Sequence, residues 1–205
     1  TTIWPIAQEG SLFSLCPCLN HGLPLWTSMM TILIREEQFG DEAAIFKITE
    51  DAFRGKPYAG GDEQILVDRL RAQKALVLSL VAVDDDKQAD ASRAEKTVVG
   101  HIAFSIAINT DGSAPWFAFG PVSVAPERQA KGIGTQLINQ GLETIQSWGA
   151  LGCILTGDPN YYSRFGFAVS PKFSPANEPA EYFQLKLLSN TTPTGTFSFH
   201  PAFYE

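Results

Sequence analysis

A glycine-rich turn between a predicted strand and a predicted helix is the first place in this sequence where chemistry could occur. Residues 122–138 read VSVAPERQAKGIGTQLI, with Gly132 and Gly134 at the entry to the helical part. Glycine lets a backbone approach a ligand, and the first N–H groups of a helix have no partner within it. Together with the helix dipole and the charges of Arg128 and Lys131, this turn could hold a phosphate or a diphosphate.

A capped helix that needs glycine only for close packing explains the same turn about equally well. The third glycine of a dinucleotide-binding fingerprint is missing, and so is the Gly-Lys-Ser/Thr ending of a P-loop. The turn taken alone therefore leaves the phosphate site and the packing explanation both open.

A crowd of aromatic residues forms a second unusual stretch, GDPNYYSRFGF at residues 157–167. Its rings surround Arg164 and Gly166, directly downstream of an apolar run. These residues form either a packed corner of the core or a place where a tyrosine takes part in chemistry, and the stretch by itself leaves both open.

Composition limits the classes of function. The chain has 205 residues, enough for one domain with its own core, and its 44% hydrophobic and 18% charged residues are typical of a soluble globular protein. A net charge of -7 argues against a nucleic-acid-binding surface, which needs a basic face. No apolar run is long enough to cross a bilayer. We therefore expect neither a nucleic acid nor a membrane as partner.

The three cysteines are Cys16, Cys18 and Cys153, an odd number without the spacing of a disulfide framework. They favour a reducing compartment, so we expect the protein in the cytoplasm. Cys16 and Cys18, with His21 nearby, could form half of a metal site. No second cysteine pair completes that site, so we expect no metal.

The hydrophobic pattern predicts the elements that would position the two stretches. Strands are expected at 32–37, 75–83, 97–108, 115–126, 151–157 and 181–189, with a last edge strand within 196–205. Helices are expected at 41–53, 62–73 and 132–148, with a loop at 54–61 and a solvated hairpin loop at 84–96. Gly120 and two prolines predict a bent or bulged course for 115–126.

Residues 1–30 differ from the rest of the chain. They contain no Lys or Arg, so they lack the basic start of a secretory signal, and Gly and Pro interrupt them repeatedly. Met29 and Met30 stand directly before an apolar strand. We interpret 1–30 as a leader outside the domain, appended or wrongly assigned as the start, or else as an arm that packs on the domain or on a partner subunit. Residues 31–205 then form a single domain.

Both unusual stretches resemble signatures of one family, the GNAT N-acetyltransferases. Tyr162, four residues ahead of Gly166-Phe167, matches the second signature of that family. The acetyl-CoA-binding motif of the family matches at every fixed position in Val124-Ala125-Pro126-Glu127-Arg128-Gln129-Ala130-Lys131-Gly132-Ile133-Gly134. The resemblance spans about residues 31–170. It implies an α+β fold with a mixed, mostly antiparallel twisted sheet, a central splay between two parallel strands, and about four flanking helices.

The resemblance implies an acetyl-CoA-dependent N-acetyltransferase, with acetyl-CoA as co-substrate and no metal. The acetyl group would pass to a primary amine of a small molecule or a peptide, by direct attack on the thioester. The alternative from another class is a non-catalytic module that binds or senses acyl-CoA, and a more distant one is an unrelated phosphate-binding α/β protein. Relatives commonly dimerise, so a homodimer is compatible with the resemblance.

The resemblance also assigns expected roles to individual residues. The last strand before the helix would offer the backbone groups of Val122, Ser123 and Val124 to the acetyl and pantetheine parts. The turn would bind the diphosphate through N–H groups of Gln129, Ala130, Lys131, Gly132, Ile133, Gly134 and Thr135. Tyr162 would act as general acid on the departing sulfur, because a phenol titrates near pH 10 and stays protonated at neutral pH. Its alternative role is that of an aromatic wedge that closes the core. Tyr161 is expected mainly to pack, and Arg164 to make a surface or backbone contact.

Two assignments are less direct. The asparagine that many members carry seven residues before the tyrosine is Leu155 here, and Asn160 is the candidate substitute for its contact with the pantetheine arm. For the general base that takes the proton of the attacking amine, we name Glu63 and His101. A strand histidine is more often structural, and an acidic residue near a helix start often serves as a cap.

Overall fold

The computed structural model describes residues 32–56, 60–84 and 97–205. The expected leader, Cys16, Cys18 and most of the 84–96 loop lie outside these ranges. The described strands are β1 (Ile32–Glu36), β2 (Leu76–Asp84), β3 (Thr97–Asn109), β4 (Trp116–Val124), β5 (Gly152–Thr156), β6 (Ala168–Val169), β7 (Phe183–Leu187) and β8 (Phe197–Ser198). The helices are α1 (Glu42–Phe53), α2 (Glu63–Ala72), α3 (Ile133–Ser147) and α4 (Pro159–Tyr162), with 3-10 turns η1 (Pro126–Arg128), η2 (Ser163–Phe165), η3 (Pro171–Phe173) and η4 (Pro201–Tyr204).

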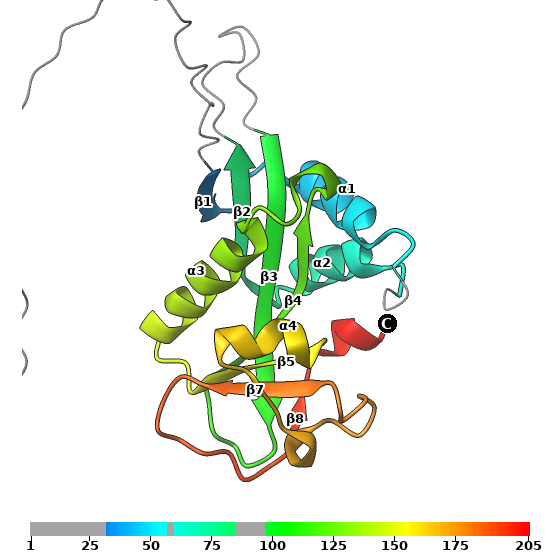
Figure 1. The fold of residues 1–205 in the computed structure, drawn as a ribbon. Helices are drawn as coiled ribbons and strands as arrows, with labels where there is room; N and C mark the ends of the chain where they lie inside the picture. The colour runs from blue at the N-terminus through cyan, green and yellow to red at the C-terminus, as the bar shows by residue number, and fades with distance from the viewer. Residues whose placement is uncertain (1–31, 57–59, 85–96) are drawn as a thin grey trace, which may run out of the picture.

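A single mixed sheet organises the described chain (Figure 1). Its strands follow the order β1-β2-β3-β4-β5-β7-β6, and β8 pairs with β3. The β4–β5 pair is parallel, and the other pairings are antiparallel. The predicted fold class, an α+β protein with a mostly antiparallel sheet around one parallel pair, is confirmed.

The parallel pair separates soon after it begins, which creates the central splay. Pairing between β4 and β5 covers only Trp116↔Gly152, Phe117↔Cys153 and Ala118↔Ile154. Beyond Ala118, β4 continues to Val124 along β3, and the register between β3 and β4 shifts on the way. Gly120 there has a φ of 149° and precedes Pro121. The bent, bulged course predicted for this strand is therefore confirmed, and it leaves the β5-facing side of the second half of β4 without a strand partner in the described chain.

Helices cover both faces of the sheet, α1 and α2 on one and α3 on the other (Figure 1). α3 lies very close to β3, because a Cβ on Gly100 would come within 3.0 Å of Ile133 and 3.1 Å of Leu137. Farther along α3, a Cβ on Gly141 would overlap the buried ring of Phe104. These close contacts fix where α3 begins relative to β3 and β4.

Two large hydrophobic clusters lie in the described chain. The first fills both faces of β2, β3 and β4 beneath the helices. The second lies where β4, β5, β7 and β8 meet, and its centre is the fully buried Trp116, whose ring meets that of Phe197 edge-on with centroids 5.0 Å apart. This second cluster anchors the strands that follow the splay.

The last segment departs from the prediction of an edge strand within 196–205. Only Phe197–Ser198 pairs with the sheet, and the chain then forms η4. The reason is local: Pro201 has no N–H to give to a ladder, and His200 Nδ1 accepts the N–H of Ala202 at 3.3 Å, which starts a helical turn. The other predicted strands and helices are present, with bounds within a residue or two. None of the helices in the described ranges is long and apolar enough to cross a membrane.

Candidate functional site

The glycine-rich turn presents unpaired backbone N–H groups at the start of α3. Ala130 and Gly132 both have positive φ angles, 59° and 82°, so the chain coils back before the helix begins. Gly132 is the N-cap residue and has no side-chain cap. The first backbone bond into the helix runs from Gln136 N–H to the Gly132 carbonyl at 3.0 Å. The N–H groups of residues 130–135 therefore point off the positive end of the helix, as an anion site requires, whereas the Gln129 N–H, also expected to bind the diphosphate, bonds to the Pro126 carbonyl at 3.4 Å.

The two cations of the turn have different surroundings. Arg128 forms an ion pair with Asp84 at 2.5 Å, and the Asp84 side chain is only 5% exposed. Lys131 is exposed, and its Nζ donates to the Glu127 carbonyl at 3.1 Å. Both cations line a pocket of about 280 Å³ beside the first turn of α3, on the side of β1. The charge of Arg128 is thus largely compensated by a buried carboxylate, and Lys131 contributes most of the positive charge there.

Tyr162 reaches the splay from α4. Its ring lies 5.8 Å from that of Phe119 on β4 and 6.3 Å from that of Phe167, centroid to centroid. Gly157 permits this position, since a Cβ there would lie 2.6 Å from Tyr162 Cε2. The ring is half-buried and packs against the main cluster. The wedge role of Tyr162 and its placement beside the splayed part of β4 coexist in the structure.

Tyr161 connects α4 to the turn. A Cβ built on Gly134 would lie 3.3 Å from the Tyr161 hydroxyl and 3.7 Å from Val124 Cγ2. The first turn of α3, the end of β4 and Tyr161 of α4 therefore meet at Gly134. This meeting point joins the two stretches that the sequence singles out.

Sequence reasoning assigned Tyr161 and Arg164 to packing and surface contacts, and their position beside the turn was missed. The short helix α4, which carries Tyr161 and directly precedes Arg164 on η2, was also missed. Asp158 caps that helix by accepting the Asn160 N–H at 2.9 Å, and Pro159 occupies its first position. An Asp-Pro pair of this kind is a recognised helix start and could have predicted α4. The Asn160 side chain also donates to Asp158, at 3.1 Å, so it takes part in the cap.

The three β4 residues expected to line the splay differ in the burial of their side chains. Val122 and Val124 are half-buried, whereas the Ser123 side chain is buried beneath α1. There the hydroxyls of Ser123 and Thr49 hydrogen-bond each other at 3.0 Å. In the adjacent strand His101 is the register partner of Ser123. A row of polar side chains thus crosses the otherwise apolar face under α1 and α2.

His101 lies within this row and is completely buried. Ser79 donates to the Glu37 carboxylate, which can only accept, so the Ser79 oxygen accepts from His101 Nε2 at 2.9 Å. The imidazole is then protonated on Nε2, and its Nδ1 has no hydrogen-bond partner among the described residues. Burial, with a smaller effect of the Arg71 charge, lowers the pKa of His101 to about 3. The ring is neutral at pH 7 and a weak base.

Glu63 is the first residue of α2 and serves the loop before it. Its carboxylate accepts the N–H groups of Gly60 at 2.7 Å and Gly61 at 3.1 Å. The structure thus places the two candidate bases apart, Glu63 at the start of α2 and His101 beneath the helices.

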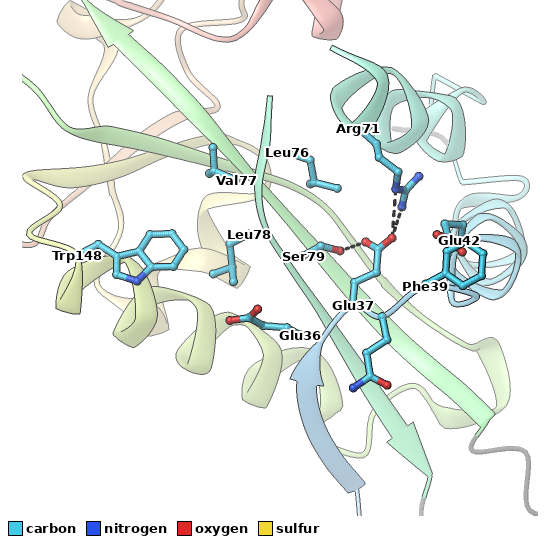
Figure 2. A pocket seen from close by; sticks show the side chains of 11 residues that line it. Glu36, Glu37, Phe39, Glu42, Arg71, Leu76, Val77, Leu78, Ser79 and Trp148 are labelled. Carbon is cyan, nitrogen blue, oxygen red and sulfur yellow. Dashed lines mark hydrogen bonds and ion pairs between the residues drawn. The ribbon is translucent and has the colours of Figure 1, made fainter. Parts of the chain in front are cut away.

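A larger pocket, of about 440 Å³, lies at the open edge of β2 (Figure 2). Glu37 bonds to both Ser79 and Arg71 there. Trp148 flanks the strand on the opposite side from Ser79. This pocket shares no lining residue with the pocket beside the turn, so we treat it as separate from the candidate site.

Residues 34–170 match the family model described as an acetyltransferase (GNAT) domain. The chain is 30% identical over 161 residues to an uncharacterized N-acetyltransferase, YhbS, of Escherichia coli strain K12. That similarity covers 75% of this chain and 90% of the relative.

Two solved structures resemble the fold closely. A GNAT family acetyltransferase from Brucella melitensis in complex with acetyl-CoA has 41% sequence identity and a TM-score of 0.71, covering 85% of this chain and 99% of that one. Escherichia coli YhbS in complex with CoA has 27% identity and a TM-score of 0.75, covering 91% of this chain and 97% of that one.

Proposed function

The chain belongs to the GNAT acetyltransferase family, and from that premise we propose that it transfers the acetyl group of acetyl-CoA to a primary amine of a small molecule or a peptide. The observation that carries the proposal is the meeting of three elements at Gly134, where the Tyr161 hydroxyl and Val124 both approach the first turn of α3. An anion site, an open strand edge and the Tyr161 phenol are thereby adjacent, and the Tyr162 ring lies 4.9 Å from that of Tyr161, centroid to centroid. The relatives solved with acetyl-CoA and CoA support the same cofactor.

The residues present fit such a cofactor. The unpaired N–H groups from Gly132 onward suit a diphosphate, and Gly134 leaves the space above them that a larger residue would fill. The free side of β4 from Val122 to Val124 offers backbone groups to an extended arm lying in the splay. Acetyl-CoA, when bound, supplies the activated acyl group and a thiolate leaving group.

Tyr162 is the proposed general acid. Its ring is fixed beside the splayed half of β4 by contacts with Phe119 and Phe167. A phenol is protonated at neutral pH and can give its proton to a thiolate, whose conjugate acid is stronger by about one to two pKa units. The backbone N–H groups of β4 would stabilise the charge that develops on the acetyl oxygen.

For the general base, the proposal keeps both His101 and Glu63. His101 is neutral and has a free lone pair on Nδ1, which supports proton acceptance, but it is completely buried and a weak base, which supports a structural role more than a catalytic one. The Glu63 carboxylate accepts two backbone N–H groups, which supports a capping role more than a catalytic one. We also propose that the protein is located in the cytoplasm and that it forms a homodimer.

Binding is tested first, by thermal unfolding with and without saturating acetyl-CoA, using ATP and NAD as controls. A ligand at about a hundred times its dissociation constant stabilises the native state by about 2.7 kcal/mol, which is readily visible. A shift specific to acetyl-CoA supports the proposal. No shift, or an equal shift with ATP, would contradict it.

Transfer is tested next, by measuring release of free thiol from acetyl-CoA with a panel of primary amines. Release that depends on the amine supports the enzyme, whereas binding without release favours the alternative, a module that only binds acyl-CoA. Tyr162→Phe keeps the ring contacts and removes the proton, so we expect turnover to fall by about 10²-fold or more with unchanged folding. Unchanged turnover would remove the general-acid role.

A further inference from the structure

Arg164 lies beside the first turn of α3 and is held there by aromatic rings. Its guanidinium carbon is 4.0 Å from the centre of the Tyr161 ring and 4.9 Å from the centre of the Phe165 ring. The hydroxyl end of that same Tyr161 ring approaches Gly134. The positive charge of Arg164 is therefore one aromatic ring away from the N–H groups of the turn.

The hydrogen-bonding capacity of this arginine is not used by the described residues. Arg164 is exposed, and no carboxylate of the described chain lies within ion-pairing distance of it. The cation–π contacts hold the guanidinium over the two rings, and its planar fork of N–H donors can bond to a ligand. The stack also fixes the side chain in advance, so less conformational entropy is lost when a ligand binds.

The charge balance of the site suggests a role for Arg164. The protein carries a formal net charge of -7, and a ligand with several phosphates needs local cations to offset the repulsion. Arg128 is already paired with the buried Asp84, and Lys131 lies on the β1 side of the turn. Arg164 lies on η2, directly after α4, over the ring of Tyr161, whose hydroxyl approaches Gly134 of the same turn.

Resting on the proposed function, we propose that Arg164, held in place by Tyr161, binds a phosphate group of the coenzyme A moiety. The phosphate is either one of the diphosphate or the one on the ribose, and both offer the same paired oxygens to the planar guanidinium. In this position Tyr161 has a second role besides packing, because it joins the arginine to the turn. Tyr161 and Arg164 are thus parts of one binding unit.

The test measures dissociation constants by titration calorimetry for CoA, for CoA lacking the ribose phosphate, and for pantetheine. Loss of a hydrogen bond to a charged group is expected to weaken binding of CoA to Arg164→Gln roughly tenfold to a hundredfold. Binding of pantetheine should stay as in the wild type. Arg164→Lys, which keeps the charge and loses the planar fork, should lie between the two.

The matched control is Lys172→Gln, which removes another cation that lies over a ring, 4.5 Å from the centre of Phe173. It should bind CoA as the wild type does. A loss seen with both CoA and its dephosphorylated form assigns Arg164 to the diphosphate, and a loss seen with CoA alone assigns it to the ribose phosphate. Either result supports the proposal.

Tyr161→Leu provides the second measurement. It should weaken CoA binding, and it should have little further effect once Arg164 is already glutamine, because coupled residues are not additive. Wild-type affinity of Arg164→Gln for CoA would overturn the inference while leaving the proposed function intact. Failure of the wild-type protein to bind CoA at all would overturn both.

Discussion

Gly157→Ala should move the proposed general acid without removing it. The added Cβ would lie 2.6 Å from Cε2 and 3.2 Å from Cδ2 of Tyr162. Two carbon atoms settle at about 3.5–4.0 Å, so one side must give way by about 1 Å. The backbone of residue 157 is held by two hydrogen bonds, its N–H to Tyr182 O at 3.0 Å and its carbonyl from Gln184 Nε2 at 2.9 Å. The half-buried ring of Tyr162 is therefore the part that moves.

The expected effect follows from that displacement. A misplacement of about 1 Å in a reacting group can cost about 10²-fold in rate, which corresponds to about 2.7 kcal/mol in the activation free energy. Overpacking against a ring that can yield should cost at the lower end of roughly 1–3 kcal/mol in unfolding free energy. The binding of acetyl-CoA at the turn should change little, because the atoms nearest to the added Cβ belong to Tyr162 and Leu155 and not to the turn.

The assay is amine-dependent thiol release under saturating acetyl-CoA, with thermal unfolding as the check on folding. The same substitution is then made in the Tyr162→Phe background. If the alanine acts by displacing the hydroxyl, it should cost almost nothing more there. A Gly157→Ala enzyme with turnover close to that of the wild type, or an equal loss in both backgrounds, would refute the link between Gly157 and the acid.

Two further predictions concern buried ionisable side chains. Arg128→Gln leaves the carboxylate of Asp84 buried without its cation, so it should lower the free energy of unfolding by about 3 kcal/mol in urea titrations. The Arg128→Gln, Asp84→Asn double variant should recover this loss. Additive losses in the double variant would count against the ion pair. The pKa of His101 in the folded state is lowered from 6.5 to about 3. Between these two values the imidazole is protonated in the unfolded chain and neutral in the folded one. The stability due to neutral His101 is complete above pH 6.5 and should decline by roughly 1 kcal/mol per pH unit between 6.5 and about 3. His101→Gln should lose this component of the pH dependence of urea unfolding, and an unaltered dependence would show that the histidine does not titrate in this window.

Local patterns were sufficient for most of the architecture. The strands and long helices appear where apolar periodicity places them, and Gly120 with its neighbouring proline correctly indicated the bend in β4. The turn at Gly132 could be recognised because its backbone conformation depends on glycine at that position, a requirement visible in the sequence.

Contacts between distant segments could not be read in the same way. Nothing in the local pattern says that the Tyr161 hydroxyl approaches Gly134, or that Arg128 pairs with Asp84. His101 was named as a candidate base, yet it is completely buried on β3, which α1 packs against. The η4 turn replaced the expected strand because a cap at His200 outweighed the apolar alternation. Each of these outcomes depends on which elements pack together.

The open edge of β2 has a consequence for solubility. β1 pairs with β2 only as far as Leu80, and the Glu37 N–H then bonds to Ser79 O, so Leu76–Leu78 have no strand beside them on that side in the described chain. An unpaired apolar edge is a template for sheet extension between molecules. Here the edge is short, it is kinked by an irregular register at Leu76–Leu78, and the charges of Glu36, Glu37 and Arg71 surround it (Figure 2). Substitutions that neutralise Glu36, or that make the register at Leu76–Leu78 regular, should therefore promote aggregation of the native protein through this edge. They should do so without any loss of fold.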